Sequence, residues 1–287
     1  MHPSDERPRM SDDSPMRVAV VGASAGLGRC IGIGLAARGV RVAFMARRKD
    51  RLENAAKEAG TDAAAVACDV TDEASCQRAF AEVTETFGGL DALVYTTGMG
   101  VLAPLADVTA AQWAQLFATN VTGASLVTAA AAPHLAANAG SAVYLSSLSA
   151  SYSTPWPMLG AYAVSKAALD KLVEAWRIEH PNIGFTRLAV GDSFGGSGDS
   201  QTEFNKTWDP AALDAACAVQ AAWAATPGQR PAYSSAQWQN CARRELVSAQ
   251  EHKECMLTYA YIQRAFGRTD PPPSPVSPPP LWIPLLP

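Results

Sequence analysis

Several features that mark whole classes of protein are missing from this sequence. Its six cysteines include no Cys-x-x-Cys pair, and its four histidines include no His-Glu-x-x-His motif. It has no run of about 18 apolar residues, and only 17% of its residues are charged, with a net charge of −4. These absences argue against a disulfide framework, a metal site, a membrane span and a nucleic-acid-binding surface. We expect reduced thiols and a cytoplasmic protein.

What the sequence does contain is a regular alternation of short apolar runs and helical patterns between residues 17 and 190. A hydrophobic content of 48% is enough for a substantial core. The alternation predicts an α/β fold, a Rossmann-like doubly wound parallel sheet in a single domain. The predicted strands are 17–21, 40–45, 64–68, 90–95, 141–145 and 183–190. The predicted helices are 26–38, 49–59, 73–87, 110–138 and 160–179.

Both ends of the sequence differ in composition from this middle part. The polar, proline-containing start indicates a disordered leader, and Met10 and Met16 are alternative starts of translation. The last residues are too rich in proline for helix or sheet. The predicted organisation is a leader at 1–15, a Rossmann-fold domain at 16–225, an atypical segment at 226–270 and a disordered Pro-rich tail at 271–287.

A glycine-rich loop connects the first predicted strand to the first predicted helix. Its sequence is Gly22-Ala-Ser-Ala-Gly26-Leu-Gly28. Glycines permit a tight turn and let backbone N–H groups approach a pyrophosphate at the positive end of the helix. We therefore predict that this loop binds a dinucleotide phosphate, through Gly22, Ser24, Gly26, Leu27 and Gly28.

Tyr162 and Lys166 lie four residues apart in a predicted helix, which places them on one face. A free phenol has a pKa near ~10, and a neighbouring cation lowers that pKa. Such a pair can move a proton near neutral pH. The same spacing also occurs on ordinary helix surfaces, so the pair gains meaning from the other motifs.

With the glycine loop and the Tyr162/Lys166 pair in this order, the sequence resembles the short-chain dehydrogenase/reductase family in its single-domain form, over residues 16–195. The resemblance implies an enzyme that transfers a hydride between a nicotinamide and the carbon of an alcohol or ketone. Other matching segments are Cys68-Asp69-Val70-Thr-Asp72, Thr119-Asn120-Val-Thr-Gly123 and Tyr144-Leu-Ser-Ser147.

The resemblance implies catalytic roles for four residues. Tyr162 would act as general acid/base on the substrate oxygen, and Lys166 would favour the phenolate and bind the nicotinamide ribose. Asn120 would position a water in the proton relay, or alternatively only pin a helix turn. Ser147 would hold the substrate oxygen, with Ser146 and Ser149 as near alternatives: alignment on the strand end favours Ser147, whereas the usual serine-to-tyrosine interval favours Ser149.

The predicted cofactor is NADP, with NAD the less favoured choice. The second strand is followed by Arg47 and Arg48 rather than by the acidic residue that would bind the ribose 2′-hydroxyl of NAD. Guanidinium groups suit a 2′-phosphate. The other cofactor contacts that the resemblance implies are Asp69, Val70, Gly98, Gly191 and Ser193, together with Tyr162 and Lys166.

Three segments depart from the family pattern. Tyr95-Thr-Thr-Gly98 stands in place of Asn-Asn-Ala-Gly, and Val190-Gly191 in place of Pro-Gly. No strand-like stretch follows residue 225, where the family has a further helix and strand. Residues 193–225 are expected to form a substrate lid.

The predicted function is an NADP(H)-dependent oxidoreductase of a small-molecule alcohol or ketone, without nucleic-acid or membrane partners, and compatible with a homo-oligomer. One alternative is a catalytically weak nucleotide-binding regulator or a homologue disrupted at its C-terminus. Another is a serine hydrolase, because Ser24 and Ser193 both lie in a Gly-x-Ser-x-Gly pattern. The glycines around Ser24 suit a phosphate better, and those after Ser193 cannot begin the helix that a nucleophile elbow needs.

Overall fold

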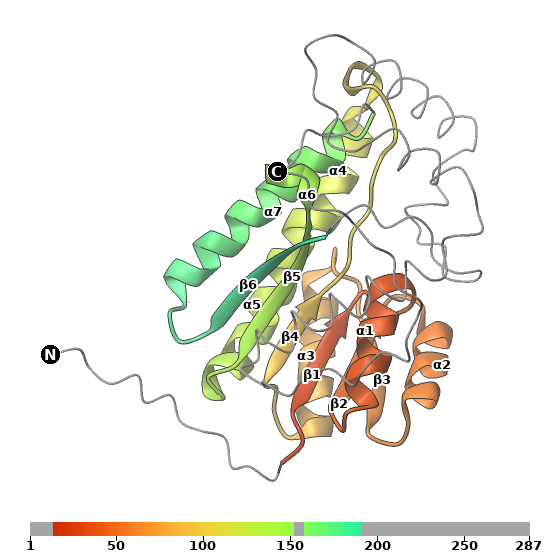
Figure 1. Ribbon diagram of the computed structural model, residues 1–287, viewed down its shortest axis with the longest axis vertical. Helices are drawn as coiled ribbons and strands as arrows, with labels where there is room; N and C mark the ends of the chain where they lie inside the picture. Colours follow the sequence, from red (N-terminus) through yellow and green to blue (C-terminus); the bar gives the residue numbers. More distant parts are fainter. Residues whose placement is uncertain (1–13, 152–157, 191–287) are drawn as a thin grey trace, which may run out of the picture.

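The computed structural model describes residues 14–151 and 158–190, and the fold is given for these residues. They contain one sheet of six parallel strands in the order β3-β2-β1-β4-β5-β6 (Figure 1). The strands are β1 (Arg17–Val21), β2 (Arg41–Ala46), β3 (Ala63–Ala67), β4 (Ala92–Tyr95), β5 (Ser141–Ser147) and β6 (Gly184–Val190).

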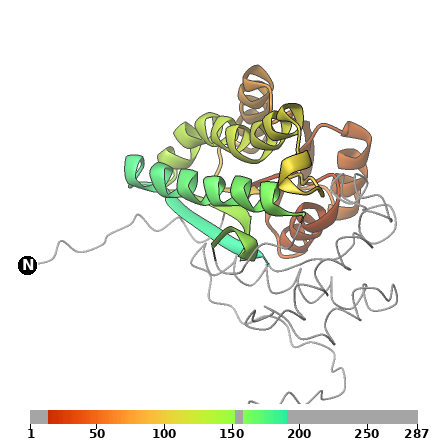
Figure 2. The same cartoon turned by 90° about the horizontal axis from the view of Figure 1, so that it is seen from above.

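Helices connect successive strands and cover both faces of the sheet (Figures 1 and 2). Helices α1 and α2 pack on one face, and α3, α5 and α7 on the other. The α-helices are α1 (Gly26–Ala36), α2 (Lys49–Ala59), α3 (Glu73–Phe87), α4 (Ala110–Phe117), α5 (Gly123–Ala137), α6 (Leu148–Ser151) and α7 (Gly160–Glu179).

Strand β1 shows how one sheet builds two hydrophobic cores. Val18 and Val20 pack with α1 and α2, whereas Ala19 and Val21 pack with the residues of the opposite face. Successive side chains of a strand point to opposite faces, so a strand covered on both sides must be apolar throughout. This arrangement confirms the doubly wound parallel sheet that the apolar runs predict.

The predicted elements agree with the structure except at one place and at their ends. Residues 110–138 do not form a single helix, because a π-helical turn at Ala118–Thr122 separates α4 from α5. The 3-10 turn at Leu105–Asp107 and helix α6 were not predicted. Most of the predicted leader, and all of the predicted lid, C-terminal segment and tail, lie outside the described residues.

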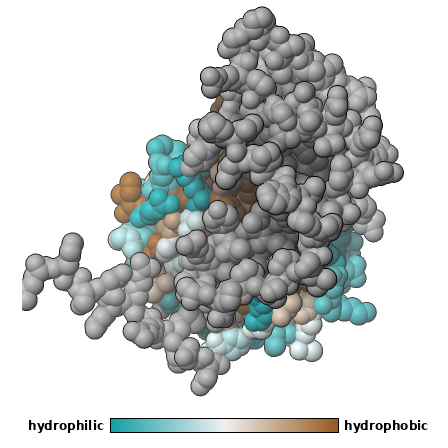
Figure 3. All heavy atoms as spheres, in the orientation of Figure 1, coloured by the Kyte–Doolittle hydropathy of each residue, from teal (hydrophilic) through white to brown (hydrophobic). Residues whose placement is uncertain are grey.

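Hydrophilic and hydrophobic residues are mixed on the described part of the face in Figure 3. Leu105, Val164 and Ile178 are large apolar side chains that are exposed. Apolar burial is otherwise concentrated at the two faces of the sheet. Across the described residues, no helix combines the length and apolar character that crossing a bilayer requires.

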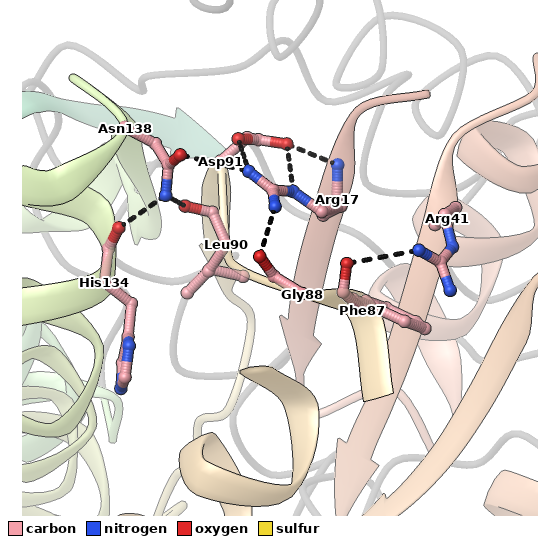
Figure 4. Close-up of polar contacts among 8 residues, drawn as sticks. All are labelled: Arg17, Arg41, Phe87, Gly88, Leu90, Asp91, His134 and Asn138. Carbon is pink, nitrogen blue, oxygen red and sulfur yellow. Dashed lines mark hydrogen bonds and ion pairs between the residues drawn. The ribbon is translucent and has the colours of Figure 1, made fainter. Parts of the chain in front are cut away.

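At the amino-terminal edge of the sheet, Arg17 ties β1 to the segments that lead into β4 and β5 (Figure 4). Its Nε and Nη2 atoms donate to the two carboxylate oxygens of Asp91 at 2.9 and 2.7 Å. The guanidinium also donates to the Gly88 carbonyl at 2.8 Å and to Asn138 Oδ1 at 3.1 Å. The hydrogen bond to Asp91 raises the pKa of Arg17, so the cation is firmly held.

Replacing Asp91 with alanine is expected to destabilise the fold by about 3 kcal/mol, because the partly buried Arg17 cation loses its main partner. Urea unfolding followed by circular dichroism measures the change. Glu53→Gln is the control, since it removes only the exposed contact of Glu53 with Lys49 at 4.0 Å and should leave the midpoint unchanged. Equal midpoints for the two variants would contradict a structural role for the Arg17 cluster.

Candidate active site

The candidate site lies at the carboxyl edge of the sheet, between β1 and β4. From β1 the chain builds β2 and β3 on one side and then returns to place β4 on the other. Ligands of open α/β sheets bind in the crevice at such a switch point. The ladder between the two strands ends at the pair Val21 and Tyr95, so Gly22 and Thr96 begin the two loops that border this crevice.

The glycine loop depends on the absence of side chains at Gly22 and Gly28. Gly22 has a φ of +95°, and a Cβ there would lie 2.6 Å from Thr96 Oγ1. A Cβ on Gly28 would overlap the same oxygen and lie 2.6 Å from the Gly22 carbonyl oxygen. Helix α1 begins at Gly26 within this loop, so its first backbone N–H groups are available to an anion.

Thr96 stabilises the start of the glycine loop through two hydrogen bonds. Its backbone N–H and its hydroxyl both donate to the Val21 carbonyl at 2.8 Å. These two bonds fasten the end of β4 to the end of β1. From the sequence, Tyr95-Thr-Thr-Gly98 is a departure from the family in which threonine hydroxyls can replace some polar contacts, but this particular contact of Thr96 was not predicted. A hydroxyl directly after a predicted buried strand is the signal that could have found it.

Two arginines follow the end of β2, and one of them, Arg48, contacts the glycine loop. Arg48 Nη2 donates to Ser24 Oγ at 2.9 Å, which places its guanidinium against the glycine loop. The side chain of Arg47 is exposed, and its positive charge acts to lower the pKa of Asp69. Burial acts to raise the pKa of Asp69, but hydrogen bonds from Thr71 and the Arg47 cation outweigh it and lower the pKa. Positive charge is therefore available where β2 ends.

The π-helical turn at Ala118–Thr122 positions Asn120, which is fully buried. Its side-chain oxygen accepts from the Met99 N–H at 2.8 Å. Its amide group donates to the Met99 carbonyl and to the Ser165 hydroxyl, both at 2.9 Å. Ser165 in turn donates to the Tyr162 carbonyl at 2.7 Å. Asn120 thus joins the loop after β4 to helix α7, and Ser165 is a contributor that sequence analysis did not single out.

Tyr162 and Lys166 occupy the first half of α7. The Lys166 Nζ atom lies 5.8 Å from the centroid of the Tyr162 ring and donates to the Leu145 carbonyl at 2.8 Å. Burial lowers the pKa of Lys166 to about 8, and the Asp170 carboxylate acts in the opposite direction. A Cβ on Gly98 would lie 3.4 Å from Nζ, so the loop after β4 passes close to the ammonium group.

The two candidate serines lie together at the end of β5. The hydroxyl groups of Ser147 and Ser149 are 2.8 Å apart, and the Ser149 N–H donates to Ser147 Oγ at 3.2 Å. Ser147 is buried and Ser149 is partly buried. The choice that the sequence left open is therefore between two members of one hydrogen-bonded pair.

The structure thus brings together two groups of predicted residues at one edge of the sheet. Val70 is a partial exception, because its side chain is buried, at 6% exposure. It packs closely against Gly123, where a Cβ would lie 2.9 Å from it. Gly191 and Ser193 lie outside the described residues. The first group is Gly22, Ser24, Gly26, Gly28, Arg47 and Arg48, and the second is Gly98, Asn120, Ser147, Tyr162 and Lys166.

The hydrolase alternative gains no support at Ser24. Its hydroxyl accepts from Arg48, as a phosphate-loop serine beside a cation would. The two histidines in the described part of the chain, His134 and His180, lie in the last turn of α5 and directly after α7. Both helices run back to the amino-terminal edge of the sheet, opposite to Ser24.

Comparison with known proteins identifies the family. The family model for short chain dehydrogenases matches residues 16–191. The chain belongs to the short-chain dehydrogenase/reductase family. The glycine loop and the Tyr162/Lys166 pair both fall within the matched region.

Individual relatives agree with this assignment. The chain is 34% identical over 180 residues to an 11-beta-hydroxysteroid dehydrogenase-like protein 2 of Arabidopsis thaliana, and the match covers 61% of this chain and 58% of the relative. It therefore spans less than two thirds of that relative's length.

Two solved structures share the fold. An alcohol dehydrogenase from the archaeon Thermococcus sibiricus, complexed with 5-hydroxy-NADP, has a TM-score of 0.61 at 25% identity and covers 72% of this chain and 91% of that one. An NADH-dependent reductase complexed with NAD has a TM-score of 0.58 at 27% identity, with 64% and 81% covered. The chain thus resembles one structure that holds 5-hydroxy-NADP and one that holds NAD.

Replacing Gly28 with alanine is expected to weaken the binding of a nicotinamide dinucleotide by about tenfold or more, or about 1.4 kcal/mol, because the new Cβ would displace Thr96 or the Gly22 carbonyl. Fluorescence titrations with NADPH and with NADH measure the affinity. Gly32→Ala is a matched control on the same helix, where the new Cβ meets the Phe44 ring; this variant should lose stability and keep its affinity. An affinity of Gly28→Ala equal to that of the wild type would refute the phosphate loop.

Proposed function

We propose that this short-chain dehydrogenase transfers a hydride between NADP(H) and a small-molecule alcohol or ketone, with Tyr162 as general acid/base. The observation that carries the proposal is the buried Lys166 ammonium beside the Tyr162 ring, 5.8 Å from its centroid. A cation at this place favours the phenolate form of the tyrosine. The phosphate loop at the same edge supports a dinucleotide as the second reactant.

Each residue of the group has a distinct task in the proposed reaction. When bound, the nicotinamide supplies the hydride chemistry. Tyr162 donates a proton to the substrate oxygen during reduction and removes it during oxidation. Lys166 holds positive charge beside the phenol and would bind the nicotinamide ribose of the cofactor. The hydroxyl pair of Ser147 and Ser149 orients the substrate oxygen.

Asn120 is proposed to combine an anchoring role with a role in the proton relay. Both protons of its amide group are engaged, by the Met99 carbonyl and by the Ser165 hydroxyl. Its Oδ1 accepts one hydrogen bond from Met99, and a carbonyl oxygen has capacity for two. A relay water would therefore bind Asn120 as a donor to Oδ1.

NADP is the cofactor that the charges near the loop favour. Relatives of similar fold are complexed with 5-hydroxy-NADP or with NAD, so similarity alone leaves the choice open. The Arg48 guanidinium lies against Ser24, and the Arg47 cation acts on Asp69. A 2′-phosphate between the end of β2 and the glycine loop would meet two guanidinium groups.

Changing both Arg47 and Arg48 to glutamine is expected to weaken NADPH binding by about 10- to 100-fold and to affect NADH binding little. Dissociation constants for both cofactors, measured by fluorescence, test this. Lys49→Gln serves as the control, because it removes one positive charge from the adjacent, exposed position. An equal loss of affinity for NADPH and NADH would contradict recognition of the 2′-phosphate.

Replacing Tyr162 with phenylalanine is expected to lower kcat/KM by a factor of about 10² to 10⁴ while NADPH affinity is retained. The assay follows NADPH oxidation across aliphatic, aromatic and steroid ketones. Tyr144→Phe is the matched control, because its buried hydroxyl bonds to Thr128 of α5, which is not one of the residues proposed for catalysis.

Two outcomes of this assay would change the conclusion. Equal rates in the wild type and in Tyr162→Phe would refute the mechanism. Tight NADPH binding by the wild type without turnover of any carbonyl would favour the alternative of a catalytically weak nucleotide-binding regulator.

A further inference from the structure

A carboxylate lies one helical turn beyond Lys166. Asp170 follows Lys166 by four residues, and Lys166 follows Tyr162 by four, so the three side chains share one face of α7. Asp170 and Lys166 are each only 4% exposed. A buried carboxylate is costly unless it is paired, so the place of Asp170 beside a second buried charge calls for a physical reason.

Arg187 on β6 holds this carboxylate in place. Its Nη1 atom lies 3.1 Å from Asp170 Oδ2 and 3.4 Å from Glu174 Oε1. Glu174 is also paired with Lys171 at 2.5 Å. Because the guanidinium is shared between two carboxylates, it compensates the charge of Asp170 only in part. Lys166, the buried cation among the described residues, lies one turn away on the same helix, and the charge of Asp170 acts on it.

The neighbouring elements supply few other groups that could take over this task. Among the described residues, Tyr144 of β5 is a titratable group on the face of the sheet that α7 covers. Burial raises the pKa of Tyr144, so it stays neutral. The only hydrogen-bond acceptor recorded for Nζ of Lys166 in the described structure is the Leu145 carbonyl, which is an uncharged group.

We propose that Asp170 is a positioning residue whose carboxylate, held by Arg187, keeps the buried Lys166 ammonium charged and thereby keeps Tyr162 competent for proton transfer. The consequence for turnover rests on the function proposed above. The effect on the charge of Lys166 does not depend on that function.

The sign of the effect follows from the two opposing influences on Lys166. Burial lowers the pKa of Lys166 to about 8, and Asp170 acts to raise it. Without the carboxylate, the pKa would fall further, and about half of the amine would be neutral near pH 7 for a fall of about 1 pH unit. A neutral amine does not stabilise a phenolate. The active form would then be lost at a lower pH.

Two substitutions that break the same ion pair test the proposal, because the proposal predicts that they shift the pKa of Lys166 in opposite directions. Asp170→Asn removes the negative charge, so the pKa of Lys166 should fall by about 1 pH unit. Arg187→Gln removes the compensating positive charge, so the pKa of Lys166 should rise. A merely structural ion pair would give no shift, or shifts in one direction.

The titration of Lys166 can be read directly. Protein labelled with ¹³C at the lysine ε carbons is titrated by NMR, and Lys166→Met assigns the resonance. Glu174→Gln is the matched control, since it removes a carboxylate that contacts the same arginine one turn farther from Lys166; it frees Arg187 for Asp170, so the pKa of Lys166 should fall by less than in Asp170→Asn. Asp170→Glu, which keeps the charge, should titrate close to the wild type.

Turnover gives a second reading. The alkaline limb of the kcat/KM profile should move to lower pH in Asp170→Asn and to higher pH in Arg187→Gln. Unchanged Lys166 titration in both variants, or a shift as large in Glu174→Gln, would overturn the proposal. Should Asp170→Asn fail to fold, a fall or no change of the pKa in Arg187→Gln would overturn it alone.

Failure of the proposed function would look different. In that case no variant, including the wild type, would turn over a carbonyl compound. The NMR titrations would still decide whether Asp170 sets the charge of Lys166.

Discussion

The buried ammonium group of Lys166, near the end of β5, constrains how α7, β5 and the loop after β4 pack together. A charge at 4% exposure needs polar partners that reach it. The Leu145 carbonyl supplies one at 2.8 Å, which requires α7 to lie directly against β5. The loop after β4 lies close to the same group, since a Cβ on Gly98 would stand 3.4 Å from Nζ. Asn120 then fixes the loop that carries Gly98 through its bonds to Met99.

Sequence reasoning recovered the parts of this arrangement that local chemistry determines. Apolar runs such as residues 17–21 predict strands buried on both faces, and the sheet has them in parallel order. The π-helical turn at Ala118–Thr122 escaped prediction because it continues the helical path and leaves the apolar pattern of 110–138 uninterrupted. The partners of Asn120 could not be predicted from local sequence, because Met99 and Ser165 are 21 and 45 residues away in the chain.

Thr96 shows why a departure from a family pattern can be misread. In the sequence, Tyr95-Thr-Thr-Gly98 is a loss of asparagine side chains. In the structure, the Thr96 hydroxyl donates to the Val21 carbonyl and is the atom against which Gly22 and Gly28 pack. That contact depends on the register in which Val21 is paired with Tyr95. Register between strands 74 positions apart is set by tertiary packing and cannot be deduced from the segment alone.

The positive charges at the two edges of the sheet have pKa values shifted in opposite directions. At the amino-terminal edge, Arg17 donates to Asp91, Gly88 and Asn138, and its pKa is raised. A cation with that many partners cannot titrate and serves stability. At the carboxyl edge, burial outweighs the influence of Asp170 and lowers the pKa of Lys166 to about 8. A cation whose charge is only just maintained near neutral pH responds to small changes around it. The same fold therefore stabilises the charge of Arg17, which contributes to stability, and leaves the charge of Lys166 sensitive to its surroundings, where proton transfer would occur.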